Sequence, residues 1–295
     1  PPPPPPPPPF FFHAEAGTPD AQESRGLGDV YKRQQKHNTL NGNILASSYI
    51  GDSGFNQCYF VQVDIDDNVY LYGLTNSPYS IYPSSVYNSL GAQFIHKLDS
   101  NLSTTLVSTS FGNGNLSRNI TPSAFLVSDC GLIYISGWGG LNINNGNISN
   151  MPIVNPTQST TNGGDFYLAV FLPDMESMIY GSYFGGSSSN EHVDGGTSRF
   201  DKNGVVYQSV CGGCGGFSDF PTTAGAWSSQ NLSNNCNNLV FKFDLDVIPL
   251  ADFSVDQTQG CRDFTVTFSN GSDSSSTYLW DFGNGDTSSI IFNPV

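Results

Sequence analysis

The chain has 295 residues, with 25 Asp and Glu against 10 Lys and Arg, so its formal net charge is −15 at neutral pH. A chain this acidic does not offer the general cationic field that nucleic acid or an anionic membrane surface requires. Gly, Ser, Asn, Thr and aromatic residues are abundant, which favours strands and turns over helices. No apolar run approaches the length of a membrane span.

Residues 1–34 differ in character from the rest of the chain. Nine prolines and three phenylalanines come first, and residues 29–34 (DVYKRQ) can be written as the codons GAT GTG TAT AAG AGA CAG. These codons resemble the transposon end used in DNA-sequencing libraries, and residues 24–28 fit the adaptor that precedes it. We therefore expect residues 1–34 to be a non-native, disordered segment and exclude them from the fold. The alternative is an extended Pro-rich linker.

Three later segments follow one pattern. Each has an apolar strand, a turn rich in Asp, Asn and Gly, and a β-branched strand centred on Tyr70, Tyr134 or Tyr207. A long polar loop and a third strand come next. In the first two units a fourth strand follows and ends at Gly112 or Gly185. The segments are 59–77 with 94–112, 123–140 with 167–186, and 195–213 with 239–246.

The spacing within the units supports a true repeat. The interval from Phe94 to Gly112 and that from Tyr167 to Gly185 are both 18 residues. The second unit is longer only in the loop between its second and third strands, which is typical of a repeated structural unit.

The strands carry apolar residues on both faces, as Tyr70 and Leu71 illustrate. A sandwich strand with one wet face alternates with polar residues, whereas a blade of a β-propeller is covered on both sides by its neighbours. The sequence thus predicts an all-β fold in which residues 35–247 form a partial β-propeller of four-stranded antiparallel blades, about three blades plus one partial. A β-helix or an irregular sandwich is the alternative.

Short motifs within these units resemble the bacterial propeller repeats called SBBP repeats. They are "SYFGG", the Asp-x-x-Gly turn before "VVY", and "CGGCGGFSDFPTTAGAW". The resemblance covers about residues 43–246. It implies a secreted or surface protein of the kind that gliding bacteria export by the type IX secretion route.

The propeller region is expected to be incomplete. Gly51 closes what resembles the fourth strand of an earlier unit, and the last unit lacks a convincing fourth strand before the next domain. We expect the missing upstream region to supply that strand and close the ring.

Residues 248–295 resemble the start of a PKD domain, a small immunoglobulin-like β-sandwich. The motif Trp280, Asp281, Phe282, Gly283, Asn284 and Gly285 carries the resemblance, together with "FTVTFSNGS". Trp280 is expected in the sandwich core beside Val266 and Phe268. Only part of such a domain is present, because the fold needs roughly a hundred residues.

Six cysteines suit an oxidising exterior. Cys211, Cys214 and Cys236 are candidates for a disulfide that holds a long loop. Together with His192 they are also candidate zinc ligands, with Asp194 orienting the histidine. Six cysteines allow fifteen connectivities, so the sequence does not select the pairing.

The sequence predicts no catalytic residues and no bound cofactor. The acidic run from Asp64 to Asn68 suggests calcium but lacks EF-hand spacing, so a hairpin turn is the preferred interpretation. His96 falls within a strand and is expected to be packed, and no serine lies in a G-x-S-x-G motif.

The expected function is that of a non-enzymatic, secreted or cell-surface scaffold or adhesion protein. Its propeller loops would bind a protein or a polysaccharide, and the PKD-like module would act as a spacer. Four loop aromatics could stack on sugar rings, although packing is their commoner role: Tyr79, Tyr82, Trp138 and Trp227. The alternative is the accessory region of a secreted polysaccharide hydrolase or protease.

Overall fold

In the computed structural model the protein is all-β, and the described residues include a single short 3₁₀ helix, η1. The described residues are 32–37, 43–140, 146–194, 198–245, 253–259, 265–271, 279–282 and 285–288. The elements are β1 (Lys32–His37), β2 (Ile44–Ile50), β3 (Asn56–Val63), β4 (Val69–Thr75), β5 (Gln93–Leu98), β6 (Thr105–Phe111), β7 (Thr121–Val127), β8 (Ile133–Trp138), β9 (Phe166–Phe171), η1 (Pro173–Met175), β10 (Met178–Phe184), β11 (Ser198–Phe200), β12 (Val205–Gly212), β13 (Asn237–Asp244), β14 (Phe253–Val255), β15 (Phe268–Asn270), β16 (Trp280–Asp281) and β17 (Thr287–Ser288).

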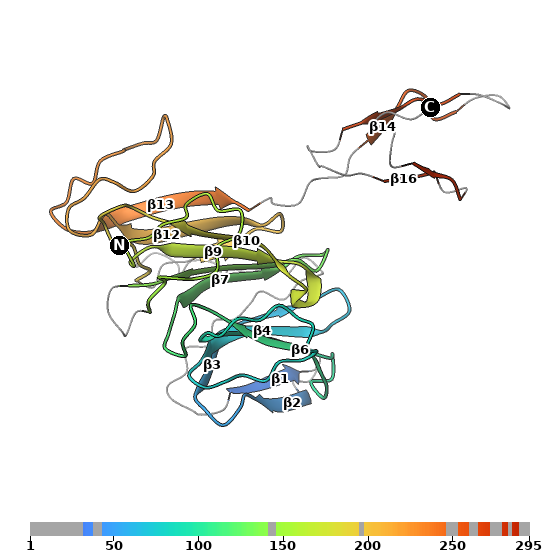
Figure 1. Cartoon of the computed structure of the whole chain (residues 1–295), viewed down its shortest axis with the longest axis horizontal. Coiled ribbons are helices and arrows are strands. Elements are labelled where there is room, and N and C mark those ends of the chain that lie inside the picture. Colours follow the sequence, from blue (N-terminus) through green and yellow to red (C-terminus); the bar gives the residue numbers. More distant parts are fainter. Residues whose placement is uncertain are drawn as a thin grey trace, which may run out of the picture.

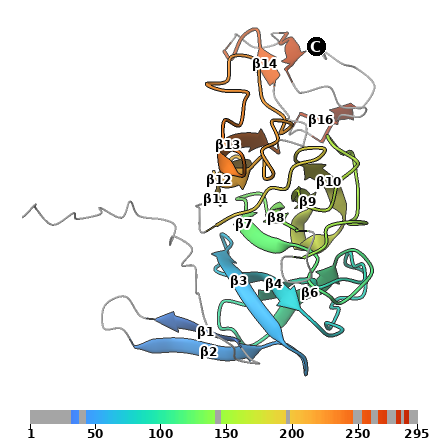
Figure 2. The ribbon, with the colours of Figure 1, turned by 90° about the vertical axis from the view of Figure 1, so that its left-hand side faces the viewer.

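Two antiparallel four-stranded sheets, β3-β4-β5-β6 and β7-β8-β9-β10, form the centre of the fold. A third sheet contains β11, β12 and β13. Figures 1 and 2 show these sheets following one another in chain order. The four-stranded antiparallel units predicted from the repeat are thus confirmed for the first two units. The described residues do not form a closed propeller.

The three tyrosine-centred strands lie in three different sheets. Tyr70 belongs to β4, Tyr134 to β8 and Tyr207 to β12, and each of these strands is an inner strand of its own sheet. The first strands of the three sheets also contact one another, β3 with β7 and β7 with β11. The repeat is therefore a repeat of whole sheets, as the sequence predicted.

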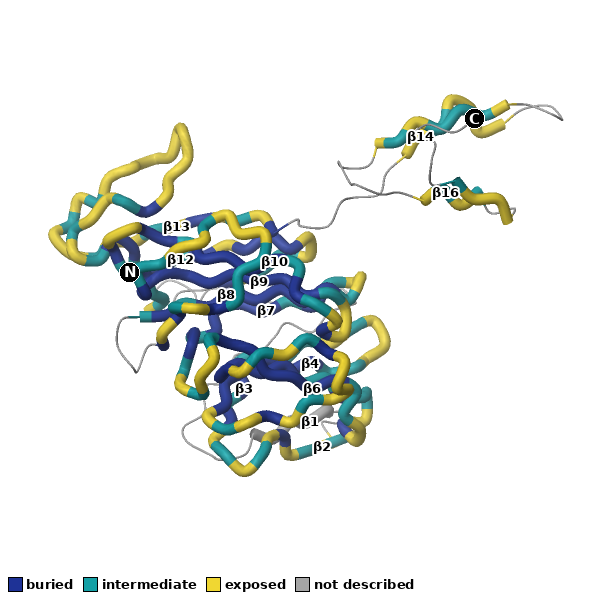
Figure 3. The backbone as a smooth tube through the Cα atoms, in the orientation of Figure 1, coloured by how far each residue is buried: buried dark blue, intermediate teal, exposed yellow. Residues whose placement is uncertain are grey.

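Strand β9 shows how the sheets cover one another. All six of its residues are buried. Tyr167, Ala169 and Phe171 belong to the core shared with the first sheet, which also contains Tyr72 and Phe111. The alternate residues of β9 point into a second core, together with Val206 and Phe241 of the third sheet. Because side chains alternate along a strand, one apolar strand contributes to two cores. Figure 3 shows β9 as buried.

The first sheet is covered on its other face as well. Leu71 and Phe94 join a third core that includes Ile50 of β2. Strand β2 pairs antiparallel with β1. The expected disordered segment 1–34 therefore overlaps a strand at Lys32–Gln34, because these residues pair with β2, while residues 1–31 lie outside the described residues.

The third sheet has no fourth strand among the described residues, so β13 is its edge. Val240 in the middle of β13 is 72 % exposed, and Tyr207 on β12 is also exposed. The outer surface of this sheet therefore lacks the cover that buries both faces of β9.

The C-terminal region contains two small two-stranded sheets, β14-β15 and β16-β17. The indole ring of Trp280 packs edge-to-face against Phe268, with centroids 5.7 Å apart, and against Phe253 at the same distance. Phe282 also contacts Phe268. Trp280, expected in a sandwich core beside Val266 and Phe268, contacts Phe268 but is only partly buried, and Gly283 and Asn284 of the motif lie outside the described residues.

Among the described residues, no helix is long and apolar enough to cross a membrane.

Candidate functional site

A disulfide joins Cys214 to Cys236, with the sulfur atoms 2.06 Å apart. It closes the loop between β12 and β13, called here the disulfide loop (residues 213–236). Cys211, the third candidate for this bond, keeps a free thiol. The disulfide withdraws two of the four predicted zinc ligands, so the predicted set of three cysteines and one histidine is not available as a set in this structure.

The backbone places His192 opposite Cys211. His192 N donates to Cys211 O at 3.1 Å, and Cys211 N donates to His192 O at 2.9 Å. This isolated bridge extends the pairing of β11 with β12. The corresponding pair in the preceding unit is Thr121 with Trp138. The two backbone hydrogen bonds fix the positions of His192 and Cys211 relative to each other.

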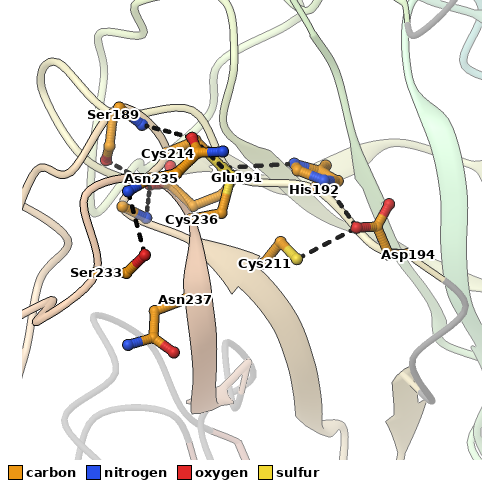
Figure 4. The surroundings of a disulfide bond; sticks show 12 residues. Ser189, Glu191, His192, Asp194, Cys211, Cys214, Ser233, Asn235, Cys236 and Asn237 are labelled. Carbon is orange, nitrogen blue, oxygen red and sulfur yellow. Dashed lines mark hydrogen bonds and ion pairs between the residues drawn. A yellow bond between two sulfur atoms is a disulfide. The ribbon is translucent and has the colours of Figure 1, made fainter.

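The two ring nitrogens of His192 face different groups (Figure 4). Nδ1 lies 3.7 Å from the Sγ of Cys214, and Nε2 lies 3.1 Å from the Oδ2 of Asp194. The indole of Trp138 packs against the imidazole, with centroids 5.8 Å apart. Asp194 thus contacts the histidine as predicted for an orienting carboxylate.

Asp194 also contacts the free thiol. The Sγ of Cys211 donates to the same Oδ2 atom at 3.2 Å. This hydrogen bond, together with the nearby His192, lowers the pKa of Asp194. Partial burial and the neighbouring Asp194 carboxylate raise the pKa of the Cys211 thiol. The thiol is therefore held protonated as a donor rather than activated as a nucleophile.

A pair of buried carboxyl groups lies near the disulfide loop. Asp165 is 0 % exposed and Glu191 is 1 % exposed. Glu191 accepts hydrogen bonds from the backbone N–H groups of Gly186 and Gly213 and from Ser189. Burial nevertheless raises the pKa of Glu191 to about 7 and that of Asp165 to about 6.

The two carboxyl groups are coupled. The Oδ1 of Asp165 has no hydrogen-bond donor among the described residues, and the Asp165 carboxylate is one of the groups that raise the pKa of Glu191. Two carboxyl groups this close in a buried site share a proton more readily than they both ionise. Because both are buried, the pair is closed to a substrate and differs from the accessible carboxyl pair of a glycosidase.

A groove of about 780 Å³ lies between the disulfide loop and the edge strand β13. Phe184 of β10 lines the groove, and Phe217, Phe220 and Trp227 line it from the disulfide loop. Polar side chains also line the groove, namely Ser218, Thr222, Thr223, Ser228, Ser229, Gln230, Asn231, Asn237, Asn238 and the cation Lys242. Leu239, Val240 and Phe241 of β13 also line it, so the groove combines a largely apolar and aromatic surface with polar side chains.

The four aromatic residues expected to contact sugars have different environments. Tyr79 is buried and stacks on Phe94, with centroids 4.6 Å apart. Trp138 is partly buried against the second core. Tyr82 is exposed, and Trp227 is 101 % exposed. Packing therefore accounts for Tyr79 and Trp138, and only Tyr82 and Trp227 present open faces.

The acidic run forms a hairpin turn between β3 and β4. The Asp64 carboxylate accepts hydrogen bonds from Asp66 N, Asn68 N and Asn68 Nδ2, at 3.0, 2.9 and 3.1 Å. It also lies 3.3 Å from Lys97 Nζ. Asp64 therefore stabilises the turn, in agreement with the interpretation of the acidic run as a hairpin turn.

His96 is packed within β5, as expected. Its ring nitrogens contact the Tyr79 hydroxyl at 2.9 Å and the Thr105 hydroxyl at 2.8 Å. Burial lowers the pKa of His96 to about 4, so the ring is neutral near pH 7. It acts as a structural hydrogen-bonding residue of the first sheet.

A comparison with known protein families finds no match to the chain, and a search of curated proteins finds no relative. The class that the fold itself defines is an all-β protein whose described residues form two antiparallel four-stranded sheets and several smaller sheets.

Sequence reasoning missed the Asp165–Glu191 pair and the contact between Asp194 and Cys211. The repeat does contain a signal that the Glu191 position is buried. Glu191 precedes His192, as Ile120 precedes Thr121 in the second sheet, and Ile120 is fully buried. Aligning the units by strand register would have placed a carboxyl group at a buried position.

Proposed function

We propose that this chain is part of a non-enzymatic, secreted or cell-surface scaffold that binds a polysaccharide in the groove beside β13. The observation that carries the proposal is the combination of an exposed aromatic face at Trp227 with a lining of amide and hydroxyl groups. Sugar rings offer apolar C–H faces to aromatic rings and hydroxyl groups to amides, so this combination suits them. The net charge of −15 favours a neutral polysaccharide over an acidic one.

We further propose that the three sheets are consecutive blades of a β-propeller of the SBBP type, and that the C-terminal region is a PKD-like spacer. The contacts of β3 with β7 and of β7 with β11 support a radial arrangement of blades, because first strands line the axis of a propeller. The packing of Trp280 against Phe268 supports the PKD-like assignment.

One feature supports export, and another bears on the alternative function. The Cys214–Cys236 disulfide suits an oxidising compartment, which is weak support on its own. The buried Asp165–Glu191 pair gives no support to the hydrolase alternative, because a substrate has no access to it.

The test is affinity electrophoresis of the purified chain in gels that contain soluble neutral polysaccharides, such as laminarin, xylan or hydroxyethylcellulose. Retardation by at least one of them is expected. Trp227→Ala should weaken binding by roughly tenfold or more, because truncating a central aromatic contact costs about 2 kcal/mol. Leu232→Ala is the matched control, since Leu232 is exposed in the same loop but does not line the groove.

The proposal fails if no polysaccharide retards the chain, or if Leu232→Ala and Trp227→Ala weaken binding equally. Binding that is lost in Tyr82→Ala but kept in Trp227→Ala would place the site elsewhere and reject the groove.

A further inference from the structure

Three potential metal ligands converge at the edge of the third sheet. The atoms are Nε2 of His192, Oδ2 of Asp194 and Sγ of Cys211, and such ligand atoms of the three residues all lie within 4.8 Å of one another. The Asp194 oxygen is 3.1 Å from the histidine nitrogen and 3.2 Å from the cysteine sulfur. Figure 4 shows these side chains directed toward one another.

These separations are close to those of a tetrahedral zinc site. Zinc binds nitrogen and oxygen ligands at about 2.0–2.2 Å and sulfur at about 2.3 Å, so neighbouring ligands around it are about 3.3–3.7 Å apart. The two contacts of Asp194 are hydrogen bonds that would lengthen by a few tenths of an ångström to admit the ion, and the separation between the ligand atoms of His192 and Cys211 is at most 4.8 Å. Asp194 is exposed, so it is free to make this adjustment.

The protein frame holds two of the three ligands in place. His192 and Cys211 are joined by two backbone hydrogen bonds across the sheet. Trp138 packs on the imidazole, and Cys214 faces the other ring nitrogen. A histidine oriented in this way loses little conformational freedom when its Nε2 binds a metal.

We propose that His192, Asp194 and Cys211 form a Zn²⁺-binding site, with water as the fourth ligand. This ligand set differs from the predicted one, because Cys214 and Cys236 are joined to each other and Asp194 coordinates the metal directly. When the ion binds, the Cys211 thiol releases its proton to solvent and the thiolate becomes the ligand. The Nε2 proton of His192 passes to solvent while Nδ1 takes up a proton, so the neutral imidazole binds through Nε2. Three protein ligands and one water make a site that is open to solvent.

The chemistry of the ligands selects the metal class. An imidazole nitrogen and a thiolate are ligands for zinc and related transition metals, whereas calcium and magnesium require sets of oxygen atoms. The site is independent of the groove beside β13, since none of its three residues lines that groove.

The test uses the full chain, purified without a polyhistidine tag and kept under non-reducing conditions so that the Cys214–Cys236 bond remains. Titration with ZnCl₂, followed by calorimetry, should show one Zn²⁺ bound per chain. Titration with CoCl₂ should give the near-ultraviolet thiolate-to-cobalt absorption together with visible bands of tetrahedral intensity. The second readout identifies sulfur as a ligand.

Cys211→Ser should abolish the thiolate-to-cobalt absorption and weaken Zn²⁺ binding by more than about 100-fold, since even outer-shell changes cost about 10–100-fold. Asp194→Asn should also weaken binding while leaving the fold intact, because the residue is exposed. Cys130→Ser is the matched control, since Cys130 is another free and exposed thiol. Circular dichroism and a thermal melt of each variant establish that it is folded.

Several results would overturn the proposal. They are the absence of Zn²⁺ binding by the oxidised chain, binding that survives both Cys211→Ser and Asp194→Asn, and binding that Cys130→Ser removes equally. Binding that appears only after the disulfide is reduced would instead assign the metal to the cysteine set that the sequence predicted.

Discussion

The side-chain amide of Gln208 in β12 donates a hydrogen bond of 2.6 Å to the hydroxyl of Ser136 in β8. The two residues are 1 % and 0 % exposed and belong to neighbouring sheets. The Gln208 carbonyl oxygen accepts from Ser198 at 2.9 Å and from Ser123 at 3.3 Å. A single buried glutamine therefore links polar groups across the interface between two otherwise apolar sheets.

Gln208→Met should destabilise the protein by about 1–3 kcal/mol, because it keeps the side-chain volume but leaves buried hydroxyl groups without their partner. Urea denaturation at pH 7 measures the change. Gln230→Met is the control, since Gln230 is exposed in the disulfide loop and should tolerate the change. Equal losses of unfolding free energy in the two variants would show that the buried hydrogen bonds of Gln208 do not stabilise the protein.

The Asp165–Glu191 pair should make stability fall as the pH rises. The pKa of Glu191 is raised from 4.5 to about 7, and that of Asp165 from 3.8 to about 6. A raised carboxyl pKa in the folded state means that folding favours the protonated form. The stabilisation is therefore complete below about pH 4 and is lost as the pH passes through about 6 and 7.

Asp165→Asn tests this pH dependence. Asparagine keeps an oxygen for the hydrogen bond from Thr161 and can donate its amide to Glu191. The difference in unfolding free energy between variant and wild type should grow in favour of the variant between pH 5 and 8, by an amount on the order of a few kcal/mol. Asp129→Asn, at an exposed position, should show no such trend. If the difference in unfolding free energy between Asp165→Asn and wild type does not change with pH, the two carboxyl groups do not interact as described.

Asp64 should be important for the first sheet although it lies in a turn. Asp64→Asn weakens the contacts with Asn68 and Lys97 and should cost about 1–3 kcal/mol, because hydrogen bonds to a charged group are stronger than neutral ones. Asp66→Asn is a close control, since Asp66 is exposed in the same turn. Thermal unfolding of both variants measures the change in stability. If Asp66→Asn destabilises the protein as much as Asp64→Asn does, Asp64 does not have this role.

Removal of the disulfide by Cys236→Ser together with Cys214→Ser should cost about 3 kcal/mol, the value that chain entropy assigns to a loop of this length. The disulfide loop should then be cleaved faster by protease, while the first two sheets remain resistant. Denaturant unfolding and mass spectrometry of limited digests provide the measurements. An unchanged rate of loop cleavage would mean that other contacts hold the loop.

The strands and their grouping were accessible from the sequence because the signals are local. Alternating apolar residues around Tyr70, Tyr134 and Tyr207, with Asp, Asn and Gly at the turns, specify hairpins through side-chain direction and backbone preference. Apolar residues on both faces of a strand further indicated cover on both sides, which β9 shows. The repetition of this pattern within one chain indicated repeated sheets, which a single strand could not have indicated.

The sites depended on distances between residues far apart in the chain, which composition and spacing do not encode. Cys214 pairs with Cys236 rather than Cys211 because the loop returns to that point in space. Asp165 meets Glu191, and Cys211 meets Asp194, only when neighbouring strands and their connections are assembled. The sequence alone thus determined where the strands form. The packing of one sheet against the next decided which side chains are buried and which ones meet, and these contacts set the pKa values and the ligand-binding geometry.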